Sequence, residues 1–497
     1  MQYSSFLGSL TWYLSVAALL AVGTVYGVTP PPDGGYTNRN TAEGDNALFS
    51  LTNGADNTAM GSNALYNNIG DTSQFSYYGS ENTAIGSQSL YSNTNGYYNI
   101  AIGSHALYTN TLGAVNTAIG NYTLWFNTTG MANCAIGYQA LVDNTTGNGN
   151  TAIGTMAMLS NESASFNTAI GDSALAENFT GASNTAIGAF SLQLNESGSN
   201  NTATGYNSLD ANLTGSNNTG TGSNALGLNT SGSNNTATGY LALAISTVGV
   251  NNAATGTSAL GANVSGNYNT ANGQGTLSNN TTGSNNTAVG QNALRANITG
   301  TNNIAIGSNA GSNLTTGNNN IDIFSVGVAG ESNAIRIGRQ GTQTGTYIAG
   351  ISGATIPSGA SVVVDTTGHL GTVTSSARYK EDIEPMAKKS EVLLSLQPVS
   401  FHYRAQLDPK GIPQFGLVAE QVAKVDPDLV LLDEMGKPYT VRYDAVNAML
   451  LNEFIKEHAQ MQSLRATIET QQKVLDAQQR QINDLRAAFE STSGQRP

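Results

Sequence analysis

A serine and a lysine five residues apart, Ser375 and Lys380, have the side chains for nucleophilic chemistry. A serine hydroxyl attacks a carbonyl only when a base takes its proton. Lysine can be that base when neutral, and because a free amine holds its proton up to a pKa of about 10.4, burial or nearby positive charge must destabilise the ammonium. Arg378 lies between the two and adds such charge. The spacing alone does not distinguish a catalytic pair from a capping serine and a solvated lysine. His369 is another candidate base, but its position in a predicted turn gives it no specific support.

The same stretch divides the chain by composition. Residues 1–374 contain no lysine and four arginines, whereas the remaining 15 of the 19 basic side chains follow Thr374. The net charge of −13 argues against nucleic acid as the main partner, because phosphate binding needs a basic face. Cys134 is the single cysteine, so an intrachain disulfide is excluded.

An uncharged apolar run covers residues 6–28. It is long enough for a bilayer, which needs about 20 residues, and it also fits a cleaved signal peptide or a buried core helix. We expect residues 1–29 to be an export signal or a membrane anchor, and residues 30–56 a linker and N-terminal cap. Either of the first two interpretations places the chain outside the cell or on its surface, with membrane anchoring through residues 6–28.

A repeat with a fixed period follows. Its first asparagine recurs every 17 residues from Asn82 to Asn303, and an earlier copy begins at Asn57 before an eight-residue insertion. Each unit, read as Asn-Thr-Ala-Ile-Gly followed by Ala-Leu, predicts two short strands and two turns, with glycines such as Gly188 and Gly198 supplying positive φ. We therefore expect a β-solenoid over residues 57–320. One Ile and one Leu per coil, plus Ala, make a thin core, which favours lateral association of several chains.

The motif Asn-x-Ala-Ile-Gly with its small-apolar pair resembles the head repeats of trimeric autotransporter adhesins. The resemblance implies a β-roll assembled as a trimer, although the period here is longer. A cell-surface or glycan ligand of this shaft is a further expectation. Several asparagines form glycosylation sequons, which we interpret as a by-product of Asn and Thr recurring as ladder residues: Asn178, Asn195, Asn212, Asn263, Asn280 and Asn297. Acidic clusters with calcium spacing are absent, and we expect neither a metal nor a cofactor.

After a β-rich neck at residues 321–374, the pattern changes to mixed helix and strand over 375–446. A long helix then begins near Asp444, and apolar residues at a spacing of three and four predict a coiled coil over 447–490, with a disordered tail at 491–497. The alternative is one amphipathic helix packed on its own domain. A trimer fits both this helix and the laterally associated array.

Three segments of the C-terminal region resemble the intramolecular chaperone of phage endosialidases, phage tail fibres and myelin regulatory factor. They are residues 375–383, residues 415–422, and Val441-Arg442-Tyr443 before the long helix. The resemblance implies trimerisation, assisted folding of the preceding β-shaft, and self-cleavage.

By this resemblance the scissile bond is Thr374–Ser375, the dyad is Ser375 and Lys380, and Arg378, Gly416 and Glu420 support the motif. Ser376 departs from the Asp that many members carry after the serine.

The sequence thus predicts a mainly β fold: a solenoid shaft, a β-rich neck and a small α+β chaperone domain ending in a trimeric coiled coil. The expected function is an exported, trimeric, tail-fibre-like or surface protein with single-turnover serine autopeptidase activity and no external substrate. The alternative is a non-enzymatic adhesin or stalk whose C-terminal domain only trimerises and anchors. A carbohydrate-cleaving fibre lacks the paired carboxylates it would need.

Overall fold

The computed structural model describes residues 37–493, apart from 71–76, 352–355, 357, 366 and 434. The apolar run at residues 6–28 lies outside the described residues, as do most of the predicted N-terminal linker before residue 37 and residues 494–497 of the predicted tail. The chain divides after Thr344 into two compact units. The first is a β-solenoid and the second is a small α+β region with a long helix, so the predicted mainly β fold class is confirmed.

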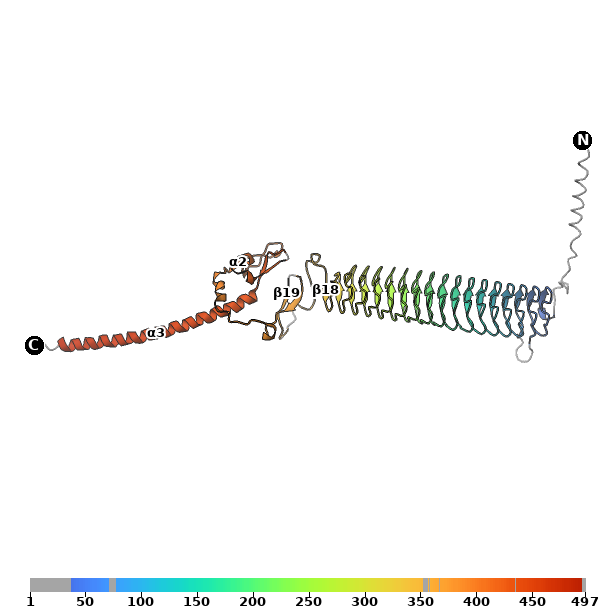
Figure 1. Cartoon of the computed structure of the whole chain (residues 1–497), viewed down its shortest axis with the longest axis horizontal. Coiled ribbons are helices and arrows are strands. Elements are labelled where there is room, and N and C mark those ends of the chain that lie inside the picture. Colours follow the sequence, from blue (N-terminus) through green and yellow to red (C-terminus); the bar gives the residue numbers. More distant parts are fainter. Residues whose placement is uncertain are drawn as a thin grey trace, which may run out of the picture. The chain divides into compact units, whose positions relative to one another are not determined.

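Each coil of the solenoid contributes one three-residue strand, and these strands form an 18-stranded parallel sheet (Figure 1). The chain enters it through η1 (Thr37–Arg39). The strands are β1 (Thr41–Glu43), β2 (Thr58–Met60), β3 (Thr83–Ile85), β4 (Ile100–Ile102), β5 (Thr117–Ile119), β6 (Cys134–Ile136), β7 (Thr151–Ile153), β8 (Thr168–Ile170), β9 (Thr185–Ile187), β10 (Thr202–Thr204), β11 (Thr219–Thr221), β12 (Thr236–Thr238), β13 (Ala253–Thr255), β14 (Thr270–Asn272), β15 (Thr287–Val289), β16 (Ile304–Ile306), β17 (Ile321–Ile323) and β18 (Ile335–Ile337).

The repeat period sets the register of this sheet. Thr185 aligns with Thr202, one period later, so that equivalent residues of successive coils form columns. The insertion is absorbed between β2 and β3 without a change of register, since Thr58 aligns with Thr83. The sheet also continues where the regular period lapses, through the pairing of Ile321 with Ile335.

The prediction of a second strand in each coil is wrong. The Ala-Leu stretch instead forms turns in which alternate residues have positive φ, as at Gly103 (136°), His105 (59°) and Leu107 (53°). This backbone bonds to both neighbouring coils: Gly103 donates to the carbonyl of Ile85 at 2.8 Å, and Leu107 to that of Thr123 at 3.0 Å. Main-chain pairing with the adjacent coils offsets the cost of a left-handed Leu, about 1–2 kcal/mol.

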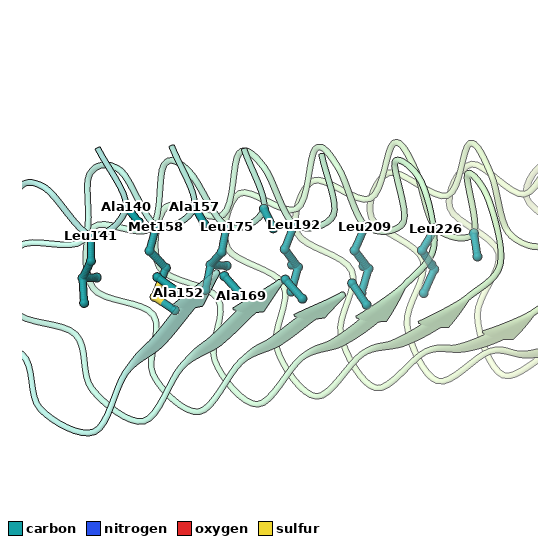
Figure 2. Packing of buried hydrophobic residues seen from close by; sticks show 14 of the residues in the cluster. Ala140, Leu141, Ala152, Ala157, Met158, Ala169, Leu175, Leu192, Leu209 and Leu226 are labelled. Atoms are coloured by element: carbon teal, nitrogen blue, oxygen red, sulfur yellow. The ribbon is translucent and has the colours of Figure 1, made fainter. Parts of the chain in front are cut away.

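Two kinds of apolar side chain fill the solenoid. The strand alanines, such as Ala152 and Ala169, lie opposite a column of turn leucines that includes Leu175 and Leu192, and all four are fully buried (Figure 2). The expectation that the repeat Ile joins this core is wrong, since Ile187 is 40% exposed. In a three-residue strand the outer two side chains point away from the middle one, and the narrow interior accepts Ala opposite Leu.

Two columns of buried asparagines run along the solenoid. In the first, Asn201 donates its main-chain N–H to Asn184 Oδ1 at 2.9 Å and its side-chain amide to the carbonyl of Gly215 at 2.9 Å. In the second, Asn212 donates Nδ2 to Asn195 Oδ1 at 2.7 Å and to the same Gly215 carbonyl at 2.9 Å. The prediction that Asn recurs as a ladder residue is confirmed, and the sequon asparagines named above are all buried in the second ladder.

The two repeat glycines serve different purposes, which corrects the sequence interpretation. Gly188 has a φ of 126°, as expected for a turn, but Gly198 is not among the residues with positive φ. A Cβ on Gly198 would lie 2.2 Å from the carbonyl oxygen of Gly215 and 2.6 Å from Asn195 Oδ1. Glycine is favoured there because the next coil and the asparagine ladder pass close to this position, although Ala164 occupies the equivalent place in another coil.

The second unit holds short strands, short helices and one long helix. A hairpin is formed by β19 (Val362–Val364) and β20 (Leu370–Thr372). It is followed by η2 (Ala377–Tyr379), η3 (Ala387–Ser395), β21 (Val399–Phe401), β22 (Gln414–Gly416), α2 (Ala419–Val425), η4 (Pro427–Leu429), β23 (Val430–Leu432), β24 (Pro438–Val441) and α3 (Tyr443–Ser493). Strands β21 and β22 pair antiparallel, as do β23 and β24. No helix among the described residues is long and apolar enough to cross a membrane.

The asparagine ladder predicts a large difference between two neighbouring asparagines. Asn280 bonds to Asn263, Asn297 and the carbonyl of Gly283, whereas Asn279 is exposed. Asn280→Ala should destabilise the shaft by about 1–3 kcal/mol for each buried partner left unsatisfied. Asn279→Ala is the matched control and should change stability by less than about 0.5 kcal/mol. Thermal unfolding followed by circular dichroism measures both, and equal effects would contradict the ladder's role.

A buried carboxylate interrupts the alanine column near the C-terminal end of the solenoid. Asp322 occupies the position of Ala305 in the neighbouring strand and is 1% exposed. Neither of its carboxylate oxygens has a hydrogen-bond partner within the described part of the chain. The pKa of Asp322 is raised to about 6, chiefly by burial and to a smaller extent by Glu331, while Ser325 and Arg336 oppose the rise.

The free energy of unfolding of the shaft should therefore fall as pH rises from about 3.8 to about 6. Between the ordinary Asp pKa near 3.8 and the folded value of about 6, the folded state binds the extra proton, so folding loses stability with increasing pH. Asp322→Asn, which keeps the shape without the charge, should remove this dependence. Melting temperatures of wild type and variant at pH 4.5 and 7.5 check this. If the melting temperature of the variant falls between these pH values by as much as that of wild type, the assignment is contradicted.

Candidate functional site

Ser375 and Lys380 flank the single turn η2. The turn forms because Tyr379 donates its N–H to the carbonyl of Ser376 and Lys380 donates to that of Ala377, each at 3.1 Å. Ser376 and Lys380 are themselves extended, with ψ of 137° and 141°. The local backbone thus places the candidate nucleophile on one side of the turn and the candidate base at its other end.

All of this stretch is exposed in the single chain. Thr374, Ser375, Arg378 and Lys380 are exposed, and the guanidinium of Arg378 lies over the ring of Tyr379, 4.7 Å from its centroid. Among the described residues, no hydrogen bond or ion pair joins the side chain of Ser375 to that of Lys380. The Thr374–Ser375 bond is accessible, but the single chain does not supply the burial that a lysine base requires.

His369, the other candidate base, belongs to the hairpin turn before this stretch. Its main-chain N–H donates to Asp365 Oδ1 at 3.0 Å, and its Nδ1 lies 3.7 Å from Asp365 Oδ2. The hydrogen bonds from Thr367 and His369 lower the pKa of Asp365. These contacts give His369 a role in the β19–β20 turn.

Gly416 has a packing role that the sequence did not reveal. A Cβ at this position would lie 2.8 Å from Tyr443 Oη. The same hydroxyl accepts the N–H of Leu417 at 2.9 Å. The absence of a side chain thus lets the first residue of α3 approach the end of β22. Glu420 is exposed in the first turn of α2, where a carboxylate favours the helix N-terminus.

A polar cluster that sequence reasoning missed attaches η3 to α3. Ser390, which is fully buried, donates to Glu453 Oε1 and accepts from Asn452 Nδ2 at 2.6 Å. Lys456 Nζ lies 2.7 Å from Glu453 Oε1 and 3.1 Å from Glu391 Oε1. Lys456 and, to a smaller extent, Ser390 lower the pKa of Glu453. The η3 and α3 residues of this cluster are about sixty positions apart and have no distinctive spacing, so no sequence pattern predicted their contact.

This unit has a small core and a large exposed apolar surface. Among the described residues of this unit, the core consists of five buried side chains: Val422, Leu429, Val430, Val441 and Met449. By contrast, Phe415 is 83% exposed, and the seam of α3 is uncovered in the single chain, with Phe454 at 64% and Leu464 at 59%. The coiled coil over 447–490 stays a prediction, but an uncovered seam of this length favours a partner helix over packing on the same domain.

Comparison with protein families connects these features. Residues 375–431 match the family model described as chaperone of endosialidase. The match begins at Ser375 and runs through η2, η3, β21, β22, α2 and η4 into β23, which confirms the resemblance in this segment. A search of curated proteins finds no match to the chain.

The contact between Gly416 and Tyr443 can be tested with two substitutions. Tyr443→Phe removes one hydrogen bond and should cost about 0.5–1.5 kcal/mol. Gly416→Ala inserts a methyl group against the hydroxyl and should cost more, because a contact of 2.8 Å requires the Tyr443 side chain to shift, which also strains its hydrogen bond to Leu417. Adding Tyr443→Phe to Gly416→Ala should recover part of the loss. Thermal unfolding of the full chain measures the C-terminal transition, and a harmless Gly416→Ala would refute this role of the glycine.

Proposed function

We propose that this chain is an exported, homotrimeric, tail-fibre-like or surface protein whose C-terminal domain is an intramolecular chaperone that cuts its own chain between Thr374 and Ser375. The observation that carries the proposal is the position of the family match, which begins at Ser375, after the β-solenoid and the β19–β20 hairpin have ended. A folding domain that starts where a repetitive shaft ends is well placed to assist that shaft and then to leave it.

The proposed cleavage uses only groups of this chain and water. Lys380, in its neutral form, takes the hydroxyl proton of Ser375 while Oγ attacks the carbonyl carbon of Thr374. The C–N bond breaks, the amine of Ser375 receives a proton, and an ester joins Thr374 to the serine oxygen. Water hydrolyses this ester, which leaves the carboxylate of Thr374 and a new N-terminal serine.

Assembly would supply the missing burial. Lys380 is exposed in the single chain, as are the apolar residues of the same unit and the seam of α3. Association of three chains through these surfaces would remove water from the lysine and favour its neutral form. Cleavage would then follow trimerisation, so that only correctly assembled shafts are released.

A second candidate is a non-enzymatic adhesin or stalk in which the same domain only trimerises and anchors. It is favoured by the exposure of Ser375 and Lys380 with no bond between their side chains, and by Ser376 at the position where many relatives carry Asp. In both candidates residues 6–28 act as an export signal or membrane anchor, the protein lies outside the cell or on its surface, and the shaft is free to bind a surface ligand such as a glycan.

Denaturing gels and N-terminal sequencing of the assembled protein decide between the candidates. Wild type should give a shaft fragment and a C-terminal fragment that begins at Ser375. Ser375→Ala and Lys380→Ala should stay at full length, as should Lys380→Arg, because a guanidinium does not lose its proton.

Ser376→Ala and Lys388→Ala, which change a neighbouring serine and a lysine in η3, are the controls and should still cleave. An assembled wild-type trimer that remains intact would eliminate the peptidase and leave the adhesin.

A further inference from the structure

The outward side of the solenoid sheet is uncharged from β2 onward, whereas β1 has Glu43 at the matching position. We define the outer strand face as the first and third residues of strands β2 to β18, whose middle residues are buried in β2 to β17 but not in β18, where Arg336 is exposed. None of these outward side chains is charged: the first residues are mostly Thr, and the third residues are Ile, Thr, Val, Met or Asn. Their aliphatic members are partly exposed, for example Met60 at 44%, Ile187 at 40% and Ile306 at 45%.

Charge is confined to other parts of the coils. Glu162, Glu177 and Glu196 lie in the turns, and acidic residues outnumber basic ones along the shaft. Like-charged shafts repel through such surfaces, whereas an uncharged face permits close approach. The outer strand face is therefore where a second shaft of the same charge can pack.

The polarity of the third residues changes along this face in a fixed order. They are aliphatic from Met60 in β2 to Ile187 in β9, polar from Thr204 in β10 to Asn272 in β14, and aliphatic again from Val289 in β15 to Ile337 in β18. Two copies placed parallel and in register bring strands with aliphatic third residues against strands with aliphatic third residues. An antiparallel copy would set the polar strands β10 to β14 against β10 to β6, where isoleucines predominate.

We infer that the outer strand face is the surface through which copies of this shaft associate, parallel and in register, around a common axis. The inference rests on the proposed homotrimer and assigns its contact surface. The face is about 80 Å long and about 10 Å wide at ordinary strand spacing and rise. Each copy thus offers on the order of 800 Å² in all, about what one partner contributes to a single standard interface, and in a trimer this area is divided between two neighbours. The same association buries the isoleucines that the solenoid core leaves outside.

Cysteine protection tests this assignment in the full chain. Cys134, the first residue of β6, lies on the outer strand face and is replaced by Ser in the background protein. Ile170→Cys places a thiol on the same face, at a position 38% exposed in the single chain. Thr146→Cys places one on an exposed turn of a neighbouring coil and is the matched control. Sedimentation first establishes that each variant is a trimer.

The cysteine at position 170 should react with N-ethylmaleimide about tenfold or more slowly than that at 146, because a buried thiol is inert. Both should react at the same rate in denaturant. A trimer in which position 170 reacts as fast as position 146 overturns the inference but leaves the homotrimer standing. A monomeric full chain overturns both, so the two failures are distinguishable.

Discussion

The buried asparagine ladders are the interaction on which the shaft depends. An interior of Ala and Leu columns offers no polar side-chain partner, so a main-chain group that points inward needs one from elsewhere in the protein. Asn201 and Asn212 provide it by bonding to the preceding coil and by sharing the carbonyl of Gly215. Where Ser246 replaces the asparagine of the second ladder, Asn229 Oδ1 is left without a partner in the described structure.

The ladders also explain the other features of the coil. They fix the register of successive coils, which lets the turn leucines keep a left-handed backbone and reach the interior. With Leu inside, the middle of the strand takes a small residue in most coils, as at Ala186 between Thr185 and Ile187. The larger aliphatic side chains are consequently displaced to the outer strand face. A shaft that is well bonded along its axis is thus left with uncovered apolar surface at its side.

The C-terminal unit likewise leaves apolar surface uncovered, although other contacts hold it together. Its few buried residues and the Ser390–Glu453 cluster hold the domain to the start of α3, while Phe415 and the helix seam remain uncovered. Ser375 and Lys380, in the same unit, are exposed as well. Shaft and chaperone therefore both have exposed apolar surface that association would cover, and the proposed cleavage couples the completion of one to the assembly of the other.

The sequence by itself determined the solenoid, the ladder asparagines, the long helix and the start of the C-terminal family match at Ser375. Each of these follows from a repeat period or a local motif. Only the tertiary structure decided that Ile187 lies outside and Ala186 inside, that Leu192 lies in a turn, and that a Cβ on Gly198 or Gly416 would come close to other atoms. In a three-residue strand the side chains alternate between two sides, and the sequence does not tell which side faces the core. Close approaches such as that of Tyr443 to Gly416 join residues whose separation along the chain carries no periodic signal.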